Sequence, residues 1–241
     1  MSLFVMNAVA AGIKLVISPL NTDEFFDNVS LLLHFDGNLT DSSNIGHTIT
    51  PVNGATTQSA GALYGESLTL NGTNQYVVLP SHTALEFRDK ARYTIEATVK
   101  PDRIDGLRTI VCQRNSGFAN NAILLFISDG KLRFLGWNPG GGLIINITST
   151  SDVVVGSQTA VAACIKDGSA YLFINGSLEA TASYSGDIKQ LSTPVEIGRD
   201  RSSSGLYFSG MIDEVRFTSG VCRYTADYLV ETSPFHNSGP A

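Results

Sequence analysis

The stretch SGMIDEVRF at residues 209–217 decides the fold of this chain. Its polar and apolar residues alternate as in a β-strand, whose successive side chains point to opposite faces. Every second residue forms the predicted core-facing row: Met211, Asp213, Val215 and Phe217. Asp213 is the acidic member of that row, and it needs a partner because an unpaired buried charge is costly.

A second stretch, LLLHFDG at residues 31–37, matches the first one. It is an apolar run that ends in an acidic residue, Asp36. We expect the two stretches to lie side by side and to close one domain, although they stand near opposite ends of the sequence. An ion shared by Asp36 and Asp213 would reconcile their like charges.

The composition excludes several classes of protein. The chain has 241 residues, of which 43% are hydrophobic and 16% charged, and a core of that size needs no disulfide support. The net charge is −6 and the 16 Lys and Arg are scattered, so the sequence predicts no nucleic-acid partner. The longest apolar stretch, residues 3–17, is too short to span a bilayer, so we expect no membrane insertion.

Three cysteines, Cys112, Cys164 and Cys222, are far apart and show no C-x-x-C spacing, which argues against a zinc site. Cys112 and Cys164 lie in apolar runs, so we interpret them as small buried hydrophobic residues. One disulfide with a spare thiol is the alternative.

From residue 29 onward the pattern is almost entirely β. Short runs rich in β-branched and aromatic residues predict strands at 29–35, 47–52, 67–70, 75–79, 93–100, 109–114, 122–128, 131–135, 143–148, 160–166, 170–174, 178–184, 195–198 and 206–217. The pairs DG at 129–130, DG at 167–168 and NG at 175–176 predict two-residue hairpin turns. The expected fold is all-β: a two-sheet antiparallel jelly-roll sandwich with an N-terminal arm.

The sequence divides into three parts. Residues 1–28 form an apolar arm that lacks a period of 2 or 3.6, and Pro19 excludes a continuous helix. The arm either packs on its own domain or docks on a partner subunit, and we favour docking because a soluble protein rarely leaves a large apolar patch free. Residues 29–235 form the sandwich, and residues 236–241 are a polar tail.

Five motifs follow one another in a familiar order: LHFDG (33–37), GESLTLNG (65–72), YTIEATVKP (93–101), LFING (172–176) and GMIDEVRF (210–217). Together they resemble the concanavalin A-like lectin and laminin-G-like superfamily over about residues 29–235, which implies a jelly-roll sandwich. The ending at residues 218–235 is similar to laminin-G-like modules of bacteriophage virion proteins.

The resemblance implies a structural calcium ion held by acidic residues of the first and final strands. The corresponding residues here are Asp36 and Asp213, with Asp41 as an additional ligand, and calcium favours such oxygen ligands. The alternative is that Asp36 and Asp41 serve turns, while Asp213 pairs with an arginine or accepts backbone N–H bonds.

A lectin site needs an aromatic platform and a few polar groups. Trp137, the only tryptophan, stands with Asn138 in the glycine-rich stretch GWNPGGG at residues 136–142. Arg199 and Arg201 belong to a second polar loop. These four residues are our candidate carbohydrate ligands. The alternative interpretation is that Trp137 is a rim residue that caps the sandwich, and that the loop with Arg199 and Arg201 is a solvated connection.

The fold also occurs in glycoside hydrolases, which need two carboxylates across the scissile bond. The E-x-D-x-x-E strand motif of such enzymes is absent. Glu96 stands between Thr94 and Thr98, and we expect it to face outward with them. Asp213 and Glu214 are adjacent, so we expect opposite faces. The sequence therefore predicts no enzyme activity.

These observations favour a non-enzymatic structural protein of a bacteriophage virion, either a capsid decoration or a tail or fibre component. Residues 1–28 would bind other virion subunits in a homo-oligomeric assembly, and the sandwich would contact host-surface glycans on the extracellular particle. The alternatives are a free carbohydrate-binding module or lectin and, less favoured, a glycoside hydrolase.

Overall fold

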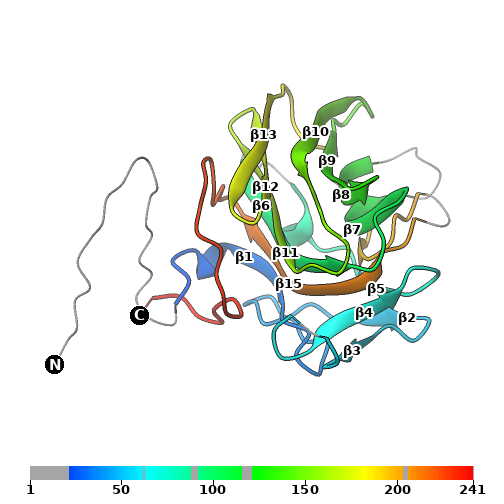
Figure 1. The fold of residues 1–241 in the computed structure, drawn as a ribbon. Helices are drawn as coiled ribbons and strands as arrows, with labels where there is room; N and C mark the ends of the chain where they lie inside the picture. Colours follow the sequence, from blue (N-terminus) through cyan, green and yellow to red (C-terminus); the bar gives the residue numbers. More distant parts are fainter. Residues whose placement is uncertain (1–21, 62, 88–91, 116–120, 203–205, 241) are drawn as a thin grey trace.

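The computed structural model describes residues 22–240 except for residues 62, 88–91, 116–120 and 203–205. Two antiparallel sheets pack face to face, and the segment after the last strand, coloured orange to red, runs outside one of them (Figure 1). The prediction of an all-β jelly-roll sandwich is confirmed. None of the helices in the described residues is long and apolar enough to cross a membrane.

Sheet A contains, in spatial order, β13 (Ser177–Ser183), β12 (Ser169–Ile174), β11 (Thr159–Lys166), β6 (Arg92–Pro101), β15 (Ser209–Ser219), β4 (Ser67–Asn71) and β3 (Thr56–Gln58), and β1 (Val29–Leu33) also pairs with β15. Sheet B contains β10 (Leu143–Asp152), β9 (Lys131–Trp137), β8 (Asn121–Ser128), β7 (Leu107–Arg114), β14 (Val195–Ile197), β5 (Tyr76–Leu79) and β2 (Thr50–Val52). Two short 3-10 turns complete the described elements, η1 (Phe26–Asn28) and η2 (Thr83–Leu85).

The three predicted hairpin turns join β8 to β9, β11 to β12 and β12 to β13, as expected. Their first residues, Asp129, Asp167 and Asn175, have φ of 48°, 49° and 49°. The glycines that follow also have positive φ. Two successive positive values define the tight turn whose twist matches a hairpin, so these local signals acted as the sequence indicates.

β15 is the central strand of sheet A. It pairs along its length with β6 on one side, and on the other side first with β4 and then with β1. In the pairing with β1, Leu31 lies opposite Phe217 and Leu33 opposite Val215. The expectation that the stretches at 31–37 and 209–217 lie side by side is therefore confirmed.

The expected alternation along β15 is wrong in one respect. Asp213 pairs with Thr98 and Arg216 with Glu96, so two residues of β15 oppose one residue of β6. This is a β-bulge, and Glu214 adopts a φ of 48° within it. The extra residue reverses the faces: Ile212, Val215 and Phe217 lie in the core, whereas Met211 and Asp213 do not.

The chain before β1 is part of the sandwich from residue 22 onward. Phe26 packs with Val29, Leu32 and Phe235, and the N–H of Asp23 donates to the carbonyl of Ser238 at 2.8 Å. The described part of the arm and the described part of the polar tail thus hold each other. Residues 1–21 lie outside the described residues, so docking of the arm on a partner subunit stays a prediction.

Candidate functional site

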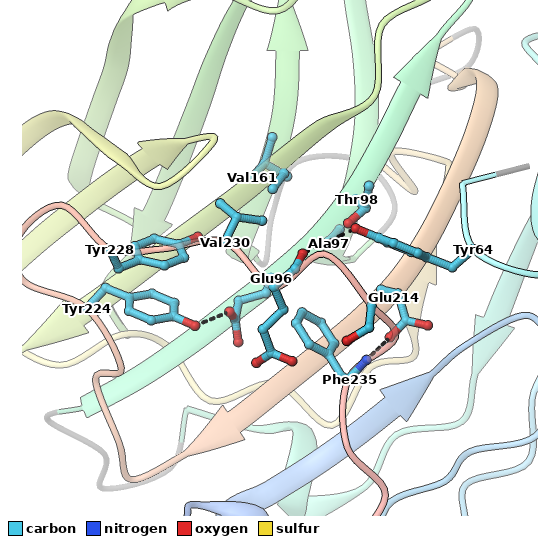
Figure 2. Close-up of a pocket in the computed structure, with 13 residues that line it drawn as sticks. Tyr64, Glu96, Ala97, Thr98, Val161, Glu214, Tyr224, Tyr228, Val230 and Phe235 are labelled. Atoms are coloured by element: carbon cyan, nitrogen blue, oxygen red, sulfur yellow. Dashed lines mark hydrogen bonds between the residues drawn. The ribbon is translucent and has the colours of Figure 1, made fainter. Parts of the chain in front are cut away.

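The outer face of sheet A is covered by the chain itself. Residues 220–240 run along this face, and their aromatic side chains gather over it (Figure 2). The rings of Tyr224 and Tyr228 stack with centroids 3.5 Å apart, and both meet the ring of Phe173 in β12 edge-on. We call residues 220–240 the C-terminal cover.

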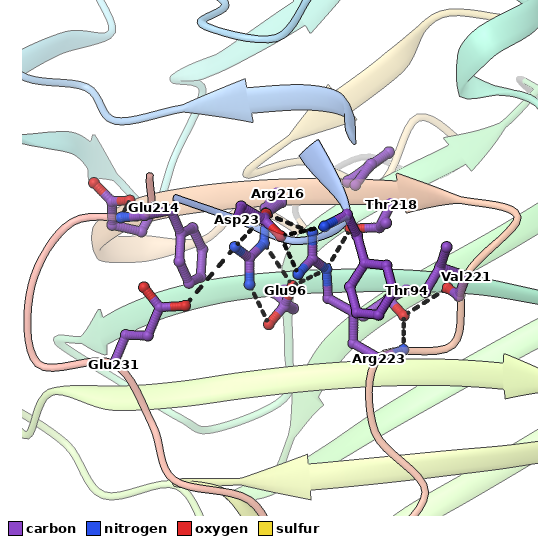
Figure 3. A network of polar contacts seen from close by, with 12 residues as sticks. Asp23, Thr94, Glu96, Glu214, Arg216, Thr218, Val221, Arg223 and Glu231 are labelled. Atoms are coloured by element: carbon purple, nitrogen blue, oxygen red, sulfur yellow. Dashed lines mark hydrogen bonds and ion pairs between the residues drawn. The ribbon is translucent and has the colours of Figure 1, made fainter. Parts of the chain in front are cut away.

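Arg216 lies beneath the C-terminal cover with 1% of its side chain exposed. Its guanidinium donates to Glu96 through Nε (2.8 Å) and Nη2 (3.1 Å), and to Asp23 through Nη1 at 3.1 Å (Figure 3). The ring of Phe235 lies 3.6 Å from the guanidinium carbon. A buried charge is tolerable only when it is paired in this way.

The same network joins the two ends of the described chain. Arg223 of the C-terminal cover donates to Asp23 at 2.6 Å (Figure 3), and the hydroxyl of Tyr224 donates to Glu96 at 2.8 Å (Figure 2). Burial raises the pKa of Asp23, but the hydrogen bond and charge of Arg223 and the charge of Arg216 outweigh it and hold that pKa below its usual value. Glu96 faces outward from its strand as expected, but the C-terminal cover encloses it.

A narrow cavity remains under the C-terminal cover, and Glu96 and Glu214 line it (Figure 2). Its inner space is about 20 Å³, whereas small-molecule sites measure about 300–1,000 Å³. Glu214 accepts a hydrogen bond from the N–H of Phe235 at 2.7 Å and contacts Nδ1 of His34 at 2.8 Å. The cavity therefore does not fit a sugar-cleaving centre, while the lack of enzyme activity as such stays a prediction.

Asp213 and Glu214 lie on the same side of sheet A, contrary to expectation. Glu214 is part of the β-bulge, and the bulge interrupts the alternation of side chains between the two faces. Asp213 is fully buried and accepts hydrogen bonds from the hydroxyl of Ser67 (2.9 Å) and the N–H groups of Tyr64 (3.1 Å) and Glu214 (2.9 Å). Burial raises the pKa of Asp213 to about 7, and the charge of Glu214 acts in the same direction.

The three predicted calcium ligands each serve the backbone. Asp41 accepts from the N–H groups of Leu32, Ser43 and His47 and from the hydroxyl of Ser43. Asp36 accepts from the N–H of Glu66 at 3.0 Å.

Nowhere in the described residues do three His, Cys, Asp or Glu side chains gather as metal ligands would. Protein donors occupy both carboxylate oxygens of Asp41 and Asp213 and Oδ1 of Asp36. This hydrogen bonding favours the alternative that they serve the backbone, and a shared calcium ion stays a prediction.

The outer face of sheet B differs from that of sheet A. Trp137 lies on it with Cys112, Leu124 and Phe126, and the guanidinium of Arg114 lies 4.8 Å from the Trp137 ring. Only 9% of Trp137 is exposed, so it does not offer the open platform that its loop suggests. It packs beneath Arg114, which favours the alternative interpretation that Trp137 is a capping residue.

Asn138 organises the glycine-rich loop. Its side-chain oxygen accepts from the N–H of Gly142 at 2.8 Å, and its backbone carbonyl accepts from the N–H of Gly141 at 2.9 Å. Gly141 has a φ of +84°, a conformation that favours glycine. Asn138 thus holds the edge of the face beside Trp137.

Arg199 and Arg201 bracket one buried carboxylate, Glu196 of β14. Nη1 of Arg201 donates to Glu196 at 3.0 Å, and Nε of Arg199 lies 3.6 Å from it. Nη1 of Arg199 also donates to the hydroxyl of Tyr76 at 2.7 Å. Burial raises the pKa of Glu196, although the two guanidinium groups lower it.

Asp200 joins the two halves of this face. It accepts from Nη1 of Arg114 at 2.6 Å, and the same arginine covers Trp137. The Ser202 hydroxyl and N–H also donate to Asp200, at 2.8 and 2.9 Å. We call the resulting surface the arginine–aromatic face: Tyr76, Arg114, Trp137, Glu196, Arg199, Asp200 and Arg201.

The structure thus brings together three of the four predicted carbohydrate residues and places Asn138 at the edge. The sequence reasoning missed Tyr76, Arg114, Glu196 and Asp200. Glu196 was recognisable as the one charged residue in the strand VEI at 195–197, where alternation places it outside the core. Asp200 and Arg114 carried no such signal, because their pairing joins positions 86 residues apart.

Solved structures of similar fold include toxin binding domains. The binding domain of Paraclostridial Mosquitocidal Protein 1 matches with a TM-score of 0.69 and 13% identity, over 86% of this chain and 51% of that one. The botulinum neurotoxin serotype D ligand binding domain, solved in complex with N-acetylneuraminic acid, matches with a TM-score of 0.62 and 13% identity, over 86% of this chain and 49% of that one. The chain spans about half the length of these solved chains.

The search of curated proteins returned no match. A family model, described as the concanavalin A-like lectin/glucanases superfamily, matches residues 71–223, which run from the end of β4 to the first residues of the C-terminal cover. That match covers more than half of the chain and includes strands of both sheets. The chain therefore belongs to the concanavalin A-like lectin/glucanases superfamily.

Proposed function

We propose that this protein is a non-enzymatic adhesive module that binds glycan through the arginine–aromatic face of sheet B. One observation carries the proposal: Tyr76, Arg199 and Arg201 reach solvent on one outer face and are held together around the buried Glu196 carboxylate. The C-terminal cover closes the opposite outer face, which leaves the arginine–aromatic face as the candidate surface for a ligand.

The chemistry of the face suits a sugar. The side chains of Arg199 and Arg201 are 25% and 33% exposed, and Tyr76 is half-buried, so these groups reach solvent while Glu196 orients the guanidiniums. Sugars present C–H surfaces to aromatic rings and hydroxyls to charged groups. A guanidinium also recognises a carboxylate well, and the complex of a similar fold with N-acetylneuraminic acid supports an acidic sugar.

A glycan array that contains sialylated and neutral sugars tests this proposal on the full chain. We expect binding to sialylated glycans, weakened by roughly 10- to 100-fold in Arg201→Ala, because one charge-assisted hydrogen bond contributes about 1.5–3 kcal/mol. Tyr76→Ala should weaken binding in the same assay. The matched control is Arg92→Ala, which removes an exposed arginine–aspartate pair from sheet A and should leave binding unchanged.

An array without hits would contradict the proposal. Hits that survive both Arg201→Ala and Tyr76→Ala would place the glycan elsewhere on the molecule and overturn the assignment of this face.

We further propose that the module is a structural subunit of a bacteriophage virion, anchored to other subunits through its apolar N-terminal arm. The sequence of the arm and the resemblance of residues 218–235 to virion modules support this role. Asp23 belongs to the buried network of the sandwich, so a deletion that starts the chain at Thr22 removes the apolar part without opening that network. The shortened protein should fold but fail to join the particle, and normal incorporation would refute the anchoring role.

A further inference from the structure

We propose that Cys164 and Cys222 form a reversible disulfide that fastens the C-terminal cover to strand β11. The pair consists of a thiol within sheet A and a thiol on the segment that closes its outer face. The remaining cysteine, Cys112, lies on the outer face of the other sheet. The inference concerns the closed side of the sandwich and stands apart from the glycan proposal.

The position of Cys222 over β11 is fixed by its two neighbours. The hydroxyl of Thr94 donates to the carbonyl of Val221 at 3.0 Å and accepts from the N–H of Arg223 at 2.9 Å (Figure 3). Thr94 of β6 is the direct cross-strand partner of Cys164 in β11. Such partners have Cβ atoms about 4.5–5.5 Å apart on the same face, so the residue held between Val221 and Arg223 lies next to Cys164.

Cys222 packs against the cluster that contains Cys164 and Phe173. The neighbouring Cys164 thiol lowers the pKa of the Cys222 thiol, and the nearby charges of Lys166 and Arg92 act in the same direction. Burial raises the pKa of the Cys164 thiol. Cys222 is half-buried whereas Cys164 is fully buried, so Cys222 is the thiol that an oxidant reaches first.

Cys112 provides an internal comparison. It is fully buried against Leu124 and Trp137, and its thiol donates to Asp200 at 3.6 Å. Burial raises the pKa of its thiol. A thiol in this state is a poor nucleophile, so Cys112 is expected to stay reduced.

The chemistry is thiol–disulfide exchange with a small disulfide such as oxidised glutathione. The Cys222 thiolate attacks one sulfur of the oxidant, which forms a mixed disulfide and releases one glutathione thiolate. Cys164 then gives its proton to that thiolate, and its sulfur attacks Sγ of Cys222 and expels the second glutathione. In total two protein thiols are oxidised to one disulfide, and one glutathione disulfide is reduced to two thiols.

The test uses the full chain in both redox states. The protein is reduced, incubated with oxidised glutathione, denatured, and its remaining thiols are alkylated before peptide mapping without reduction. We expect the peptide with Cys164 to be linked to the peptide with Cys222, and Cys112 to be alkylated. A closed loop of this size should raise Tm by roughly 5–15 °C, and dithiothreitol should reverse the shift.

Three outcomes would overturn the proposal. Glutathione retained on Cys222 with Cys164 alkylated would show that the second step fails. Alkylation of all three cysteines would show that oxidation fails, and a linkage that includes Cys112 would show the wrong pairing. As a matched variant, Cys112→Ser must give the same linked peptide as the natural chain, whereas Cys222→Ser must give none.

Discussion

The two outer faces of the sandwich carry similar residue types in opposite states. On sheet A, Arg216 is completely enclosed between Glu96, Asp23 and the ring of Phe235. On sheet B, Arg201 also binds a buried glutamate, yet a third of its side chain is exposed. The difference arises because the C-terminal cover crosses sheet A.

This difference separates structural charges from charges that are available to a ligand. A guanidinium whose N–H groups all bind buried carboxylates, under a layer of aromatic rings, affects the stability of the fold. The sign of that effect depends on how well the charge is paired. A guanidinium that is oriented by a buried carboxylate and still reaches solvent can exchange water for a ligand. The sandwich thus uses one face to hold its two chain ends together and leaves the other for recognition.

The largest expected effect comes from Arg216→Ala. The change leaves Glu96 and Asp23 with one fewer buried partner, and removing one member of a buried ion pair costs about 3–5 kcal/mol. Urea denaturation at neutral pH should show that loss in the free energy of unfolding. Arg92→Ala is the matched control: it also removes an arginine–aspartate pair, but its members are 52% and 49% exposed, so we expect no measurable change.

An equal effect of the two substitutions would mean that the buried network contributes no more than a surface pair. The distinction between the two faces would then rest on exposure alone.

The second effect is a dependence of stability on pH that arises from Asp213. Its pKa is raised by burial from 3.8 to about 7. Between these values the unfolded chain has lost the proton while the folded chain keeps it, so stability falls as pH rises from about 4 to 7. The limit of this loss is about 4 kcal/mol, since one pKa unit corresponds to about 1.4 kcal/mol.

His34 acts in the same direction on the same face. Burial lowers its pKa, but the hydrogen bond and charge of Glu214 outweigh burial and raise the pKa above 6.5. Its contribution is present below pH 6.5 and is lost as pH rises through the raised value. Asp213→Asn removes the first contribution alone. The free energy of unfolding should therefore decrease less between pH 5 and pH 8 in Asp213→Asn than in the natural chain. Equal decreases in the two proteins would contradict the raised pKa.

Local sequence signals predicted the fold well. The hairpins at Asp129, Asp167 and Asn175 and the pairing of β1 with β15 depend on turn chemistry and on apolar strands, both of which are visible in the residues themselves. The bulge at Glu214 escaped prediction because a bulge adds one residue without changing composition. The alternation read across it therefore assigned Asp213 to the wrong side.

The candidate site was predictable only in part, for a related reason. Trp137, Arg199 and Arg201 stood out by residue type and loop position. Their connection through Arg114 and Asp200 joins distant parts of the chain, and a single sequence does not show which arginine meets which aspartate. The enclosure of Arg216 likewise depends on the C-terminal cover, whose residues carry no local signal that they fold back over sheet A.

A third and smaller effect concerns the contact between the C-terminal cover and the turn beneath it. Gly176 has a φ of +78°, and a Cβ there would collide with the carbonyl oxygen of Tyr228. Gly176→Ala should destabilise the protein by about 1–2 kcal/mol through backbone strain and should also speed proteolysis within residues 220–240. Gly130→Ala is the matched control: its φ is +86°, but the nearest atom to a Cβ would be 3.4 Å away.

Both glycine substitutions should cost the same backbone strain, so the proteolysis rate isolates docking of the cover. Glycan binding should be unaffected by Gly176→Ala, because the arginine–aromatic face lies on the other sheet. Loss of binding in this variant would contradict the separation of the two faces.

The smallest expected effect is the response to calcium, which the resemblance predicts and the hydrogen bonding disfavours. A calcium ion needs six to eight oxygen ligands, yet Asp41 and Asp213 already accept four and three hydrogen bonds from protein donors. An ion would have to displace those donors and leave N–H groups unpaired. We therefore expect Tm in excess EDTA and in millimolar calcium to agree within about 1 °C, since a shift of that size corresponds to well under 1 kcal/mol. A rise of several degrees with calcium, abolished in Asp213→Asn but retained in Asp167→Asn, would show that an ion rather than the backbone is the partner of Asp213.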